Sequence, residues 1–473
     1  MEPTYEQLKA DNEQLKAENA ALKHEVCELK AVIEKLLVRI ADLEAKLNKN
    51  SKNSSKPPSS DQKSSLPLIK RKEKRPYHPG ATRQLVPESM VTSRTQKCID
   101  VCPRCSSSMN PTGEVVKWQQ IELPEIKPLV HQWDLHVCQC PTCLLVATPT
   151  LEKGEQYLLG PKFEALVNLC LSRFRMGHLV VREFVATLVP GIFLSQGLVS
   201  KIKRRASNAL LSPHQQIMEE ILDGKAPLHA DATGWRHMGK NEHTIVMRVN
   251  NWVAFAFVSH QNKATLNELL PKRGLYIVSD RGLPVSEVEA RIHQYCLAHL
   301  LRNLRGLAEH ANTTPEEAQV LGEIHDAIQS LFIDKHRMDR GEISEGTWRQ
   351  YGYQAWLCIE EMVDELHGNN TSKKVHRFIR KIKKGWKHFK AYLRHSEYPM
   401  TNNPAEEALR SLVIARKLCF GSRSEYGRKW RAAIQSCVET LHRQGRSILD
   451  YVAEVIRASR LGSPCPDIRS FRT

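Results

Sequence analysis

Residues 228–236 read Leu-His-Ala-Asp-Ala-Thr-Gly-Trp-Arg, and here the chain changes from helical to strand-like patterning. The run from Pro227 to Ala230 predicts a short strand, and Thr233-Gly234 predicts a turn soon after it. Asp231 is therefore expected at the end of a strand. A carboxylate in this position can bind a metal ion or cap a turn, and the stretch alone does not distinguish the two roles.

A second apolar run ends in a carboxylate in the same way. Residues 275–280 read Leu-Tyr-Ile-Val-Ser-Asp, and Asp280 is followed by Arg-Gly. Around these two runs, the pattern predicts three strands, a helix, a strand, a helix and a last strand over 293–299. This order is that of a ribonuclease-H-like mixed α/β core, which we expect over residues 221–420.

A third carboxylate stands at the start of a predicted helix. Residues 401–406 read Thr-Asn-Asn-Pro-Ala-Glu, which suits Asn403 as the N-cap, Pro404 as the first helical residue and Glu406 as the third. In that arrangement Glu406 can close a capping box with the N-cap residue. Alternatively, Glu406 joins the two strand-end aspartates across the sheet to hold two divalent ions.

The composition favours a polyanionic partner. Lysine and arginine number 69 against 52 acidic residues, which gives a net charge of +17 and a pI near 9.3. Such an excess is typical of nucleic-acid-binding proteins, although a generally basic soluble protein has the same signature. With 473 residues, of which 41% are hydrophobic, the chain is long enough for several domains with real cores.

Neither a membrane span nor export is expected. No apolar run reaches about 18 residues, the length that crosses a bilayer, and the N-terminus is acidic and polar rather than signal-like. The 13 cysteines are an odd number, and several cluster between 98 and 143 at metal-like spacing. This distribution favours a reducing compartment and a metal site over a disulfide framework. We therefore expect a cytoplasmic protein that does not associate with membranes.

Residues 1–50 carry a heptad repeat without proline or glycine inside it. Leucine recurs in every heptad at Leu8, Leu15, Leu22, Leu29, Leu36 and Leu43. With leucine at position d, position a holds asparagine twice and then mostly β-branched residues, which favours a parallel dimer. We expect a coiled-coil homodimer or higher oligomer through this segment; the alternative is a single amphipathic helix that packs on its own domain.

Residues 51–90 are interpreted as a flexible basic linker. They include Asn-Ser-Ser-Lys-Pro-Pro-Ser-Ser-Asp, which is polar and has no periodicity. The run Lys-Arg-Lys-Glu-Lys-Arg at 70–75 suits a phosphate-binding arm, and it equally suits a solvated segment.

Residues 91–155 contain two Cys-Pro-x-Cys knuckles. Four thiolates in this arrangement can close a tetrahedral zinc site between two hairpins, so we expect one structural Zn²⁺. The stretches 115–124 and 130–137 between the knuckles are expected to be strands. The nearby Cys98 and Cys138 are spare candidates, and the expected ligands are Cys102, Cys105, Cys140 and Cys143.

Residues 156–220 are expected to be helical. Helices over 163–174 and 180–188 precede a Pro-Gly pair, and a helix from about Ser195 ends in a basic run. A helix, a glycine turn and a basic helix resemble a helix-turn-helix, although a generic three-helix unit explains the pattern equally well. The candidates for DNA contact in this segment are Lys201, Lys203, Arg204 and Arg205.

A helical insertion is expected at about 303–395, between the second aspartate and the glutamate. Its most basic stretch, 373–384, mixes cations with aromatic and apolar residues. That mixture suits a nucleic-acid track, and an exposed amphipathic helix is the simpler interpretation. Just before the insertion, Cys296 and His299 can ligate a metal, but two ligands alone favour a structural or DNA-facing role. Residues 421–473 are expected to form a C-terminal helical region.

Taken together, these motifs resemble transposases of the insertion sequence 66 family. The resemblance rests on the stretches around Asp231 and Asp280, on Cys-Leu-Ala-His at 296–299, and on Asn-Asn-Pro-Ala-Glu with the later Ala-Arg-Lys at 402–417. The zipper, the Asn-Ser-Ser-Lys-Pro-Pro linker and the two knuckles are also similar, so nearly the whole chain is covered. The chain departs from the family at 74–80, where glycines are usual, and at Glu407, where arginine is usual.

The resemblance implies that Asp231, Asp280 and Glu406 form an Asp-Asp-Glu triad that binds two Mg²⁺ ions, or Mn²⁺ in their place. Asp231 would contact both ions, and the other two carboxylates one each. Water would first cut a DNA strand at an element end, and the freed 3′-hydroxyl would then attack target DNA in the same site. On the helix that is expected to begin near Asn403 and to carry Glu406, the candidates for DNA contact lie on the solvated face and are Arg410, Arg416 and Lys417.

Two other functions are consistent with the same residues. One is a metal-dependent nuclease on the same core, without strand transfer. The other is a DNA-binding dimer that has lost catalysis. Metal-dependent nicking separates an enzyme from a binding protein, and joining of donor ends to target separates a transposase from a nuclease.

Overall fold

The computed structural model describes residues 5–48, 84–271, 274–282, 292–368 and 371–472. The chain forms two compact units, one of residues 63–133 and one of residues 1–62 with 134–473. The basic run at 70–75 and the helix expected between the last two strands lie outside the described residues.

The heptad segment forms one long helix, α1 (Tyr5–Leu47), as expected. Its apolar stripe is open in the single chain, where Leu22 is 58% and Leu29 is 54% exposed. An uncovered apolar stripe of this length is what a helix with a partner presents. The helix itself is confirmed, and the partner helix stays a prediction.

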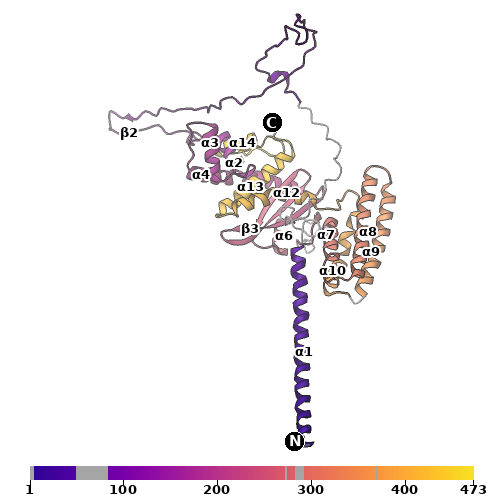
Figure 1. The fold of residues 1–473 in the computed structure, drawn as a ribbon. Helices are drawn as coiled ribbons and strands as arrows, with labels where there is room; N and C mark the ends of the chain where they lie inside the picture. Colours follow the sequence, from indigo (N-terminus) through magenta and orange to yellow (C-terminus); the bar gives the residue numbers. More distant parts are fainter. Residues whose placement is uncertain (1–4, 49–83, 272–273, 283–291, 369–370, 473) are drawn as a thin grey trace. The chain divides into compact units, whose positions relative to one another are not determined.

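A mixed five-stranded sheet lies at the centre of the larger unit (Figure 1). The antiparallel strands β3 (Leu228–His237), β4 (Lys240–Val249) and β5 (Trp252–Val258) form a meander. On the other side of β3, β6 (Tyr276–Ser279) and β7 (Ile292–Tyr295) add in parallel. The strand order is β5-β4-β3-β6-β7, so β3 is central and β6 is its direct neighbour.

β3 is longer than the sequence suggested, and the turn expected at Thr233-Gly234 is wrong. These two residues pair with Thr244 and His243 of β4, and the chain turns only after His237. Pairing with β4 satisfies the backbone of a segment whose composition is typical of a turn. Asp231 therefore lies inside β3 rather than at its end.

The last strand is shorter than expected. β7 ends at Tyr295, and Leu297 opens α7 (Leu297–Ala308), so 293–299 is not one strand. The backbone nitrogen of Leu297 donates to the carbonyl of Met400, and Cys296 is the N-cap residue of α7. This early helix start puts Cys296 and His299 on one turn, where residues three apart share a face.

Alternate residues of the sheet enter two cores, as the strand period of two requires. Ile245 and Met247 face the larger core, whereas Val246 packs with α12 (Asn403–Cys419). In Figure 1 the magenta and yellow helices that share the larger core lie close together. These helices are α2 (Pro161–Ser172), α4 (Gln196–Ala209), α5 (Leu211–Leu222), α13 (Glu425–Arg443) and α14 (Ile448–Leu461). A further helix of this region, α3 (His178–Leu188), contacts α2 and α4.

The edge strand β5 is covered by α13. The hydroxyls of Thr440 and Ser436 accept hydrogen bonds from the backbone nitrogens of Val253 and Phe255, at 3.0 and 2.9 Å. An edge strand whose amides are occupied cannot pair with another chain. The larger core therefore runs across the boundaries expected at 220 and 420, and α13 is part of the sheet domain.

The helical insertion has its own core. α7 packs against α8 (Pro315–Asp339), α8 against α9 (Glu345–Gly368), and α9 against α10 (Lys373–Lys384). Figure 1 shows α8, α9 and α10 side by side in orange. The short α11 (Trp386–Phe389) and the 3-10 turn η4 (Ala391–Arg394) return the chain to β7. The described residues of the expected insertion at about 303–395 are thus mainly helical.

The segment between the two cysteine knuckles does not contain the expected strands at 115–124 and 130–137. Its apolar side chains face solvent, with Val116 92% and Leu129 104% exposed. A strand needs a hydrogen-bonded neighbour and an apolar face to bury, and this stretch gains neither in the described chain. A hairpin of β1 (Cys138–Gln139) and β2 (Val146–Ala147) forms around the second knuckle, and an isolated antiparallel bridge joins Val101 and Ser108 around the first.

Candidate active site

The pairing of β3 with β6 brings the two aspartates together. Ala230 lies opposite Ser279 in this parallel ladder, and Asp231 and Asp280 are the next residue of each. Glu406 comes from the first turn of α12, which packs on β3 and β4. Burial, together with the charges of Asp280 and Glu406, raises the pKa of the Asp231 carboxyl to about 7. The three predicted carboxylates thus share one electrostatic environment.

Backbone amides orient both aspartates. Asp231 accepts a hydrogen bond from the nitrogen of Ala232 at 2.7 Å, and Asp280 accepts one from the nitrogen of Gly282 at 2.9 Å. A side chain at Gly282 would place its Cβ 3.0 Å from Asp280 Oδ2. The glycine after Asp-Arg is therefore needed for the carboxylate to take this position.

Helix α12 begins one residue earlier than expected, so the capping-box alternative for Glu406 is wrong. Asn402 is the N-cap residue, and its side chain makes no capping hydrogen bond. The side-chain amide of this fully buried asparagine instead donates to the carbonyl of Ala230 at 2.8 Å. Its Oδ1 lies 3.3 Å from Nδ1 of His229. These contacts join the start of α12 to β3 directly beside Asp231.

Glu406 points toward α7 rather than back to its own N-terminus. Its two carboxylate oxygens lie 3.5 Å from Nδ1 of His299 and 3.5 Å from Nη2 of Arg302. Glu406 Oε1 and His299 Nδ1 are buried, and within the described residues neither makes a hydrogen bond. Burial lowers the pKa of His299, and the charge of Glu406 opposes this change.

Cys296 belongs to the same cluster. The backbone nitrogen of Asn402 donates to its sulfur at 3.2 Å. One ligand atom each from Cys296, His299 and Glu406 lies within 4.8 Å of the others. The Cys-x-x-His pair, which sequence alone favoured as structural or DNA-facing, therefore lies against the third carboxylate.

The donor atoms fit divalent cations. Carboxylate oxygens are hard ligands that suit Mg²⁺ or Mn²⁺, and a raised pKa in a cluster of acids marks charge that a cation would neutralise. Asp231, Asp280 and Glu406 supply such oxygens, and Glu406 Oε1 is buried without a hydrogen bond in the described chain. Cys296 and His299 add softer donors, of the kind that suits Zn²⁺.

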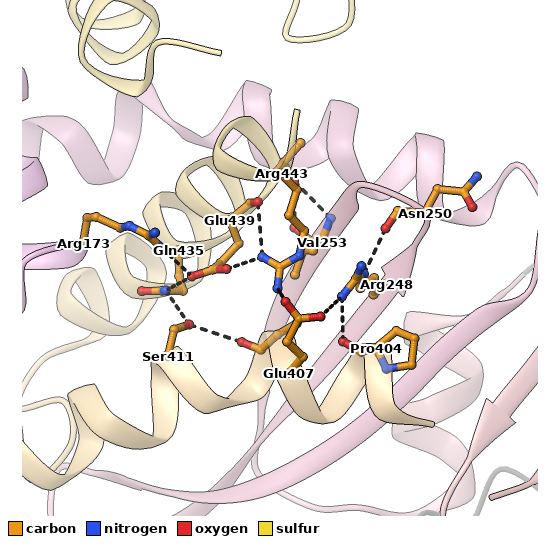
Figure 2. Close-up of polar contacts among 12 residues, drawn as sticks. Arg173, Arg248, Asn250, Val253, Pro404, Glu407, Ser411, Gln435, Glu439 and Arg443 are labelled. Carbon is orange, nitrogen blue, oxygen red and sulfur yellow. Dashed lines mark hydrogen bonds and ion pairs between the residues drawn. The ribbon is translucent and has the colours of Figure 1, made fainter. Parts of the chain in front are cut away.

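The neighbouring Glu407 is engaged elsewhere. Figure 2 shows it between Arg248 of β4, at 2.9 Å, and Arg443 of α13, at 3.3 Å. Arg443 also pairs with the buried Glu439, and Arg248 donates to the carbonyl of Pro404 at 3.1 Å. The hydrogen bond from Arg248 lowers the pKa of Glu407. In this arrangement Glu407 faces α13, whereas Glu406 faces α7.

The basic residues expected on α4 fall into two groups. Lys201 and Arg204 are exposed. Lys203 lies over the ring of Trp430, 4.5 Å from its centroid, and burial lowers its pKa to about 8. Arg205 pairs with the buried Glu164 of α2. The partners of Lys203 and Arg205 favour a structural role for both, and Lys201 and Arg204 remain available to a ligand.

The three basic residues expected on α12 also differ. Arg410 and Lys417 are exposed. Arg416 donates to the hydroxyl of Thr233 at 2.8 Å and to the carbonyl of Gly234. Arg416 therefore joins the last turn of α12 to β3 at Thr233 and Gly234, whereas Asn402 joins the start of the helix to Ala230.

Each cysteine knuckle forms the same turn within its own unit. The nitrogen of Ser106 donates to the carbonyl of Cys102, and Ser106 has a φ of 59°. In the other knuckle, the nitrogen of Leu144 donates to the carbonyl of Cys140, and Leu144 has a φ of 58°. Hydrogen bonds lower the pKa of Cys105 and of Cys140. The thiols are thus biased toward the thiolate that zinc requires.

The fold and site define a basic α/β protein with a carboxylate centre between its sheet and a crossing helix. The model of the Transposase IS66 family matches residues 171–429, a span that includes all three carboxylates. The chain belongs to this family of transposases. A family of unknown function, DUF6444, matches residues 1–84. No curated protein matches the chain. No described helix is both long and apolar enough to cross a membrane.

Proposed function

We propose that this transposase cuts DNA at the ends of its element and joins them to target DNA, using Asp231, Asp280 and Glu406 in a ribonuclease-H-like core. The strand order β5-β4-β3-β6-β7, with an antiparallel meander followed by two parallel strands, supports that core. The membership of the family supports the reaction class.

The observation that carries the proposal is the meeting of three acids, with Asp231 and Asp280 following paired residues of β3 and β6 and Glu406 in the first turn of α12. The carboxyl of Asp231 is perturbed first by burial and then by the charges of Asp280 and Glu406. Strongly perturbed acids cluster at functional sites, because such an arrangement costs stability and is kept where function requires it. Two residues on adjacent strands and one on a crossing helix meet here although they are far apart in the sequence.

Each residue has a proposed role. Asp231 would bind both divalent ions, and Asp280 and Glu406 one each. Divalent ions held in this way supply a Lewis acid that activates water and stabilises the charge developing on a phosphodiester. Arg302, 3.5 Å from Glu406, is suited to hold the carboxylate in place and to attract the DNA phosphate.

DNA would approach over the exposed cations. Lys201 and Arg204 on α4 and Arg410 and Lys417 on α12 have side chains open to solvent. Contacts of this kind position the phosphate backbone without reading its sequence. The N-terminal helix would bring two chains together, one for each end of the element.

The test is an assay in which purified protein, labelled element-end DNA and a target plasmid are incubated with and without Mg²⁺. Metal-dependent cleavage followed by joined products is the expected result. Cleavage without joining would favour the nuclease alternative. Binding without cleavage in Mg²⁺ and in Mn²⁺ would overturn the catalytic proposal and leave a DNA-binding dimer.

A further inference from the structure

The helical insertion carries a cleft whose walls are cationic and aromatic. It encloses about 500 Å³, within the usual range of ligand sites of roughly 300–1,000 Å³. α9 supplies one wall, and the segment from the end of α10 through η4 supplies the other. The lining residues are Tyr353, Lys383, Lys384, Trp386, Lys387, Lys390 and Arg394.

The charge of the cleft is only partly balanced. Lys383 pairs with Asp364 at 2.5 Å, and Lys390 pairs with Glu360 at 3.3 Å. The other three cations, Lys384, Lys387 and Arg394, are exposed and have no carboxylate partner among the described residues. Unbalanced cations in a cleft attract a polyanion.

The aromatic residues differ in what they can contact. Trp386 packs edge-on against the buried Trp356, at 5.2 Å between ring centroids, and Lys390 covers its ring at 5.3 Å. Tyr353, in contrast, is 49% exposed at the cleft. Trp386 thus shapes the floor of the cleft, whereas the ring of Tyr353 is open to a ligand.

The cleft is fastened to the strand layer that carries Asp280. His388 Nδ1 lies 3.1 Å from the carbonyl of His293 in β7, and Gly385 packs so closely on Tyr295 that a Cβ there would lie 2.8 Å from its ring. On the next strand over, the guanidinium of Arg281, directly after Asp280, lies 5.9 Å from the ring centroid of Phe389. The segment that lines the cleft therefore packs on β7 and beside the residue that follows Asp280.

We propose that this cleft binds a single DNA strand, with its phosphates on Lys384, Lys387 and Arg394 and an unpaired base against Tyr353. Cations that follow a backbone, with an exposed aromatic ring among them, are the features by which proteins hold unpaired strands. The inference rests on the proposed function, because the bound DNA strand would be one that the carboxylate site has opened or cut. It adds a DNA site on the insertion, separate from the sheet and from α4.

Binding is tested by fluorescence anisotropy with the full-length protein, without added divalent cation, so that the result does not depend on cleavage. The probes are a labelled oligothymidylate and a duplex of the same length. Tyr353→Ala should weaken binding of the single strand by about tenfold, the typical cost of one lost stacking contact. Tyr353→Phe should bind normally, because it keeps the ring.

Tyr351 provides the matched control. It is 40% exposed on the same helix but does not line the cleft. Side chains that are two residues apart in a helix are rotated by about 200° relative to each other around its axis. Tyr351→Ala should therefore leave single-strand binding unchanged. Equal effects of Tyr351→Ala and Tyr353→Ala, or an equal loss for the duplex, would overturn the contact with an unpaired base.

The phosphate contacts are tested by salt dependence. Changing Lys384, Lys387 and Arg394 together to Gln should reduce the slope of log affinity against log salt by about two, since each lost phosphate contact removes about 0.7 for a single strand. The control changes three exposed cations of α10 outside the cleft to Gln, namely Arg377, Arg380 and Lys381. An equal change of slope in the control would show a general field rather than a site. Failure of cleavage in the element-end assay would leave these binding results standing, so the two proposals fail separately.

Discussion

The side-chain amide of Asn402 donates a hydrogen bond to the main-chain carbonyl of Ala230 over 2.8 Å. Ala230 immediately precedes Asp231, and Asn402 immediately precedes the helix that carries Glu406. This buried amide therefore joins the strand of the first carboxylate to the helix of the third. Because Asn402 is fully buried, solvent cannot replace this contact.

Asn402→Ala should reduce both stability and activity. It removes a buried hydrogen bond to the carbonyl of Ala230, at a cost of about 1–3 kcal/mol. DNA cleavage should fall further than the loss of folded protein explains, because α12 loses its anchor beside Asp231. Chemical denaturation and the cleavage assay measure the two effects. Asn403→Ala is the control, because Asn403 is exposed; equal losses in both variants would contradict the assigned role.

The pKa of Asp231 predicts how stability depends on pH in metal-free protein. An unfolded aspartate titrates near pH 3.9, whereas Asp231 in the folded protein titrates at about 7. Between these values the folded state holds a proton that the unfolded chain has released. The contribution of Asp231 to stability is therefore largest below about pH 4, and this contribution is lost as the pH rises through 7.

Asp231→Asn should remove this loss. At about pH 8 the variant should be more stable than the parent protein by on the order of 2 kcal/mol, since one pKa unit corresponds to about 1.4 kcal/mol and part of the side chain remains accessible. Thermal melting across the pH range checks this, and Mg²⁺ should raise the melting temperature of the parent protein only. Parallel pH profiles for the two proteins would mean that Asp231 is not perturbed.

The two cysteine knuckles should bind one zinc ion per chain. Each forms a tight turn with a residue of positive φ, and in each the pKa of one thiol is lowered. Elemental analysis should give about one equivalent, lost when Cys102 and Cys140 are changed to Ser. The spare Cys98 and Cys138 are the controls. Zinc retained in the first double variant but lost with Cys138→Ser would identify a different ligand set.

The apolar stripe of α1 should mediate self-association. Leu22→Lys with Leu29→Lys places charges on a stripe that is exposed in the single chain and that a partner helix would cover. Light scattering of the full-length variant should give a smaller assembly than the parent protein. His24→Lys with Ala31→Lys, on the opposite face of the heptad, should leave the mass unchanged. An unaltered mass in the leucine variant would show that α1 does not mediate self-association.

The sequence predicted most of the helices and strands because each signal was local. Apolar runs marked the strands, and Asn-Pro near Glu406 marked a helix start. It did not predict that β3 continues through Thr233-Gly234, because that depends on pairing with β4 and on Arg416 lying across the glycine. A turn-like composition was overridden by contacts with residues far along the chain.

The role of Asn402 was missed for a similar reason. The sequence offers two adjacent asparagines, and propensity alone does not say which one caps the helix and which one turns inward. The choice depends on the carbonyl of Ala230, more than 170 positions away. Likewise, the position of Cys296 and His299 beside Glu406 depends on where β7 ends. The strand ends before Leu297, whose backbone nitrogen donates a hydrogen bond to the carbonyl of Met400.

The last prediction separates Glu406 from Glu407. Glu406→Gln keeps the size of the side chain and removes the charge that a metal ligand needs, so cleavage and strand transfer should both be lost while folding and DNA binding persist. Asp231→Asn and Asp280→Asn should behave alike.

Glu407→Gln weakens ion pairs with Arg248 and Arg443 at a side chain that is 61% exposed, which should cost at most about 1 kcal/mol. Its cleavage activity should be close to that of the parent protein, because Glu407 faces α13 and Glu406 faces α7. Activity lost in Glu407→Gln but kept in Glu406→Gln would show that Glu407, not Glu406, is the third carboxylate. Activity kept in all four variants would refute catalysis by these acids.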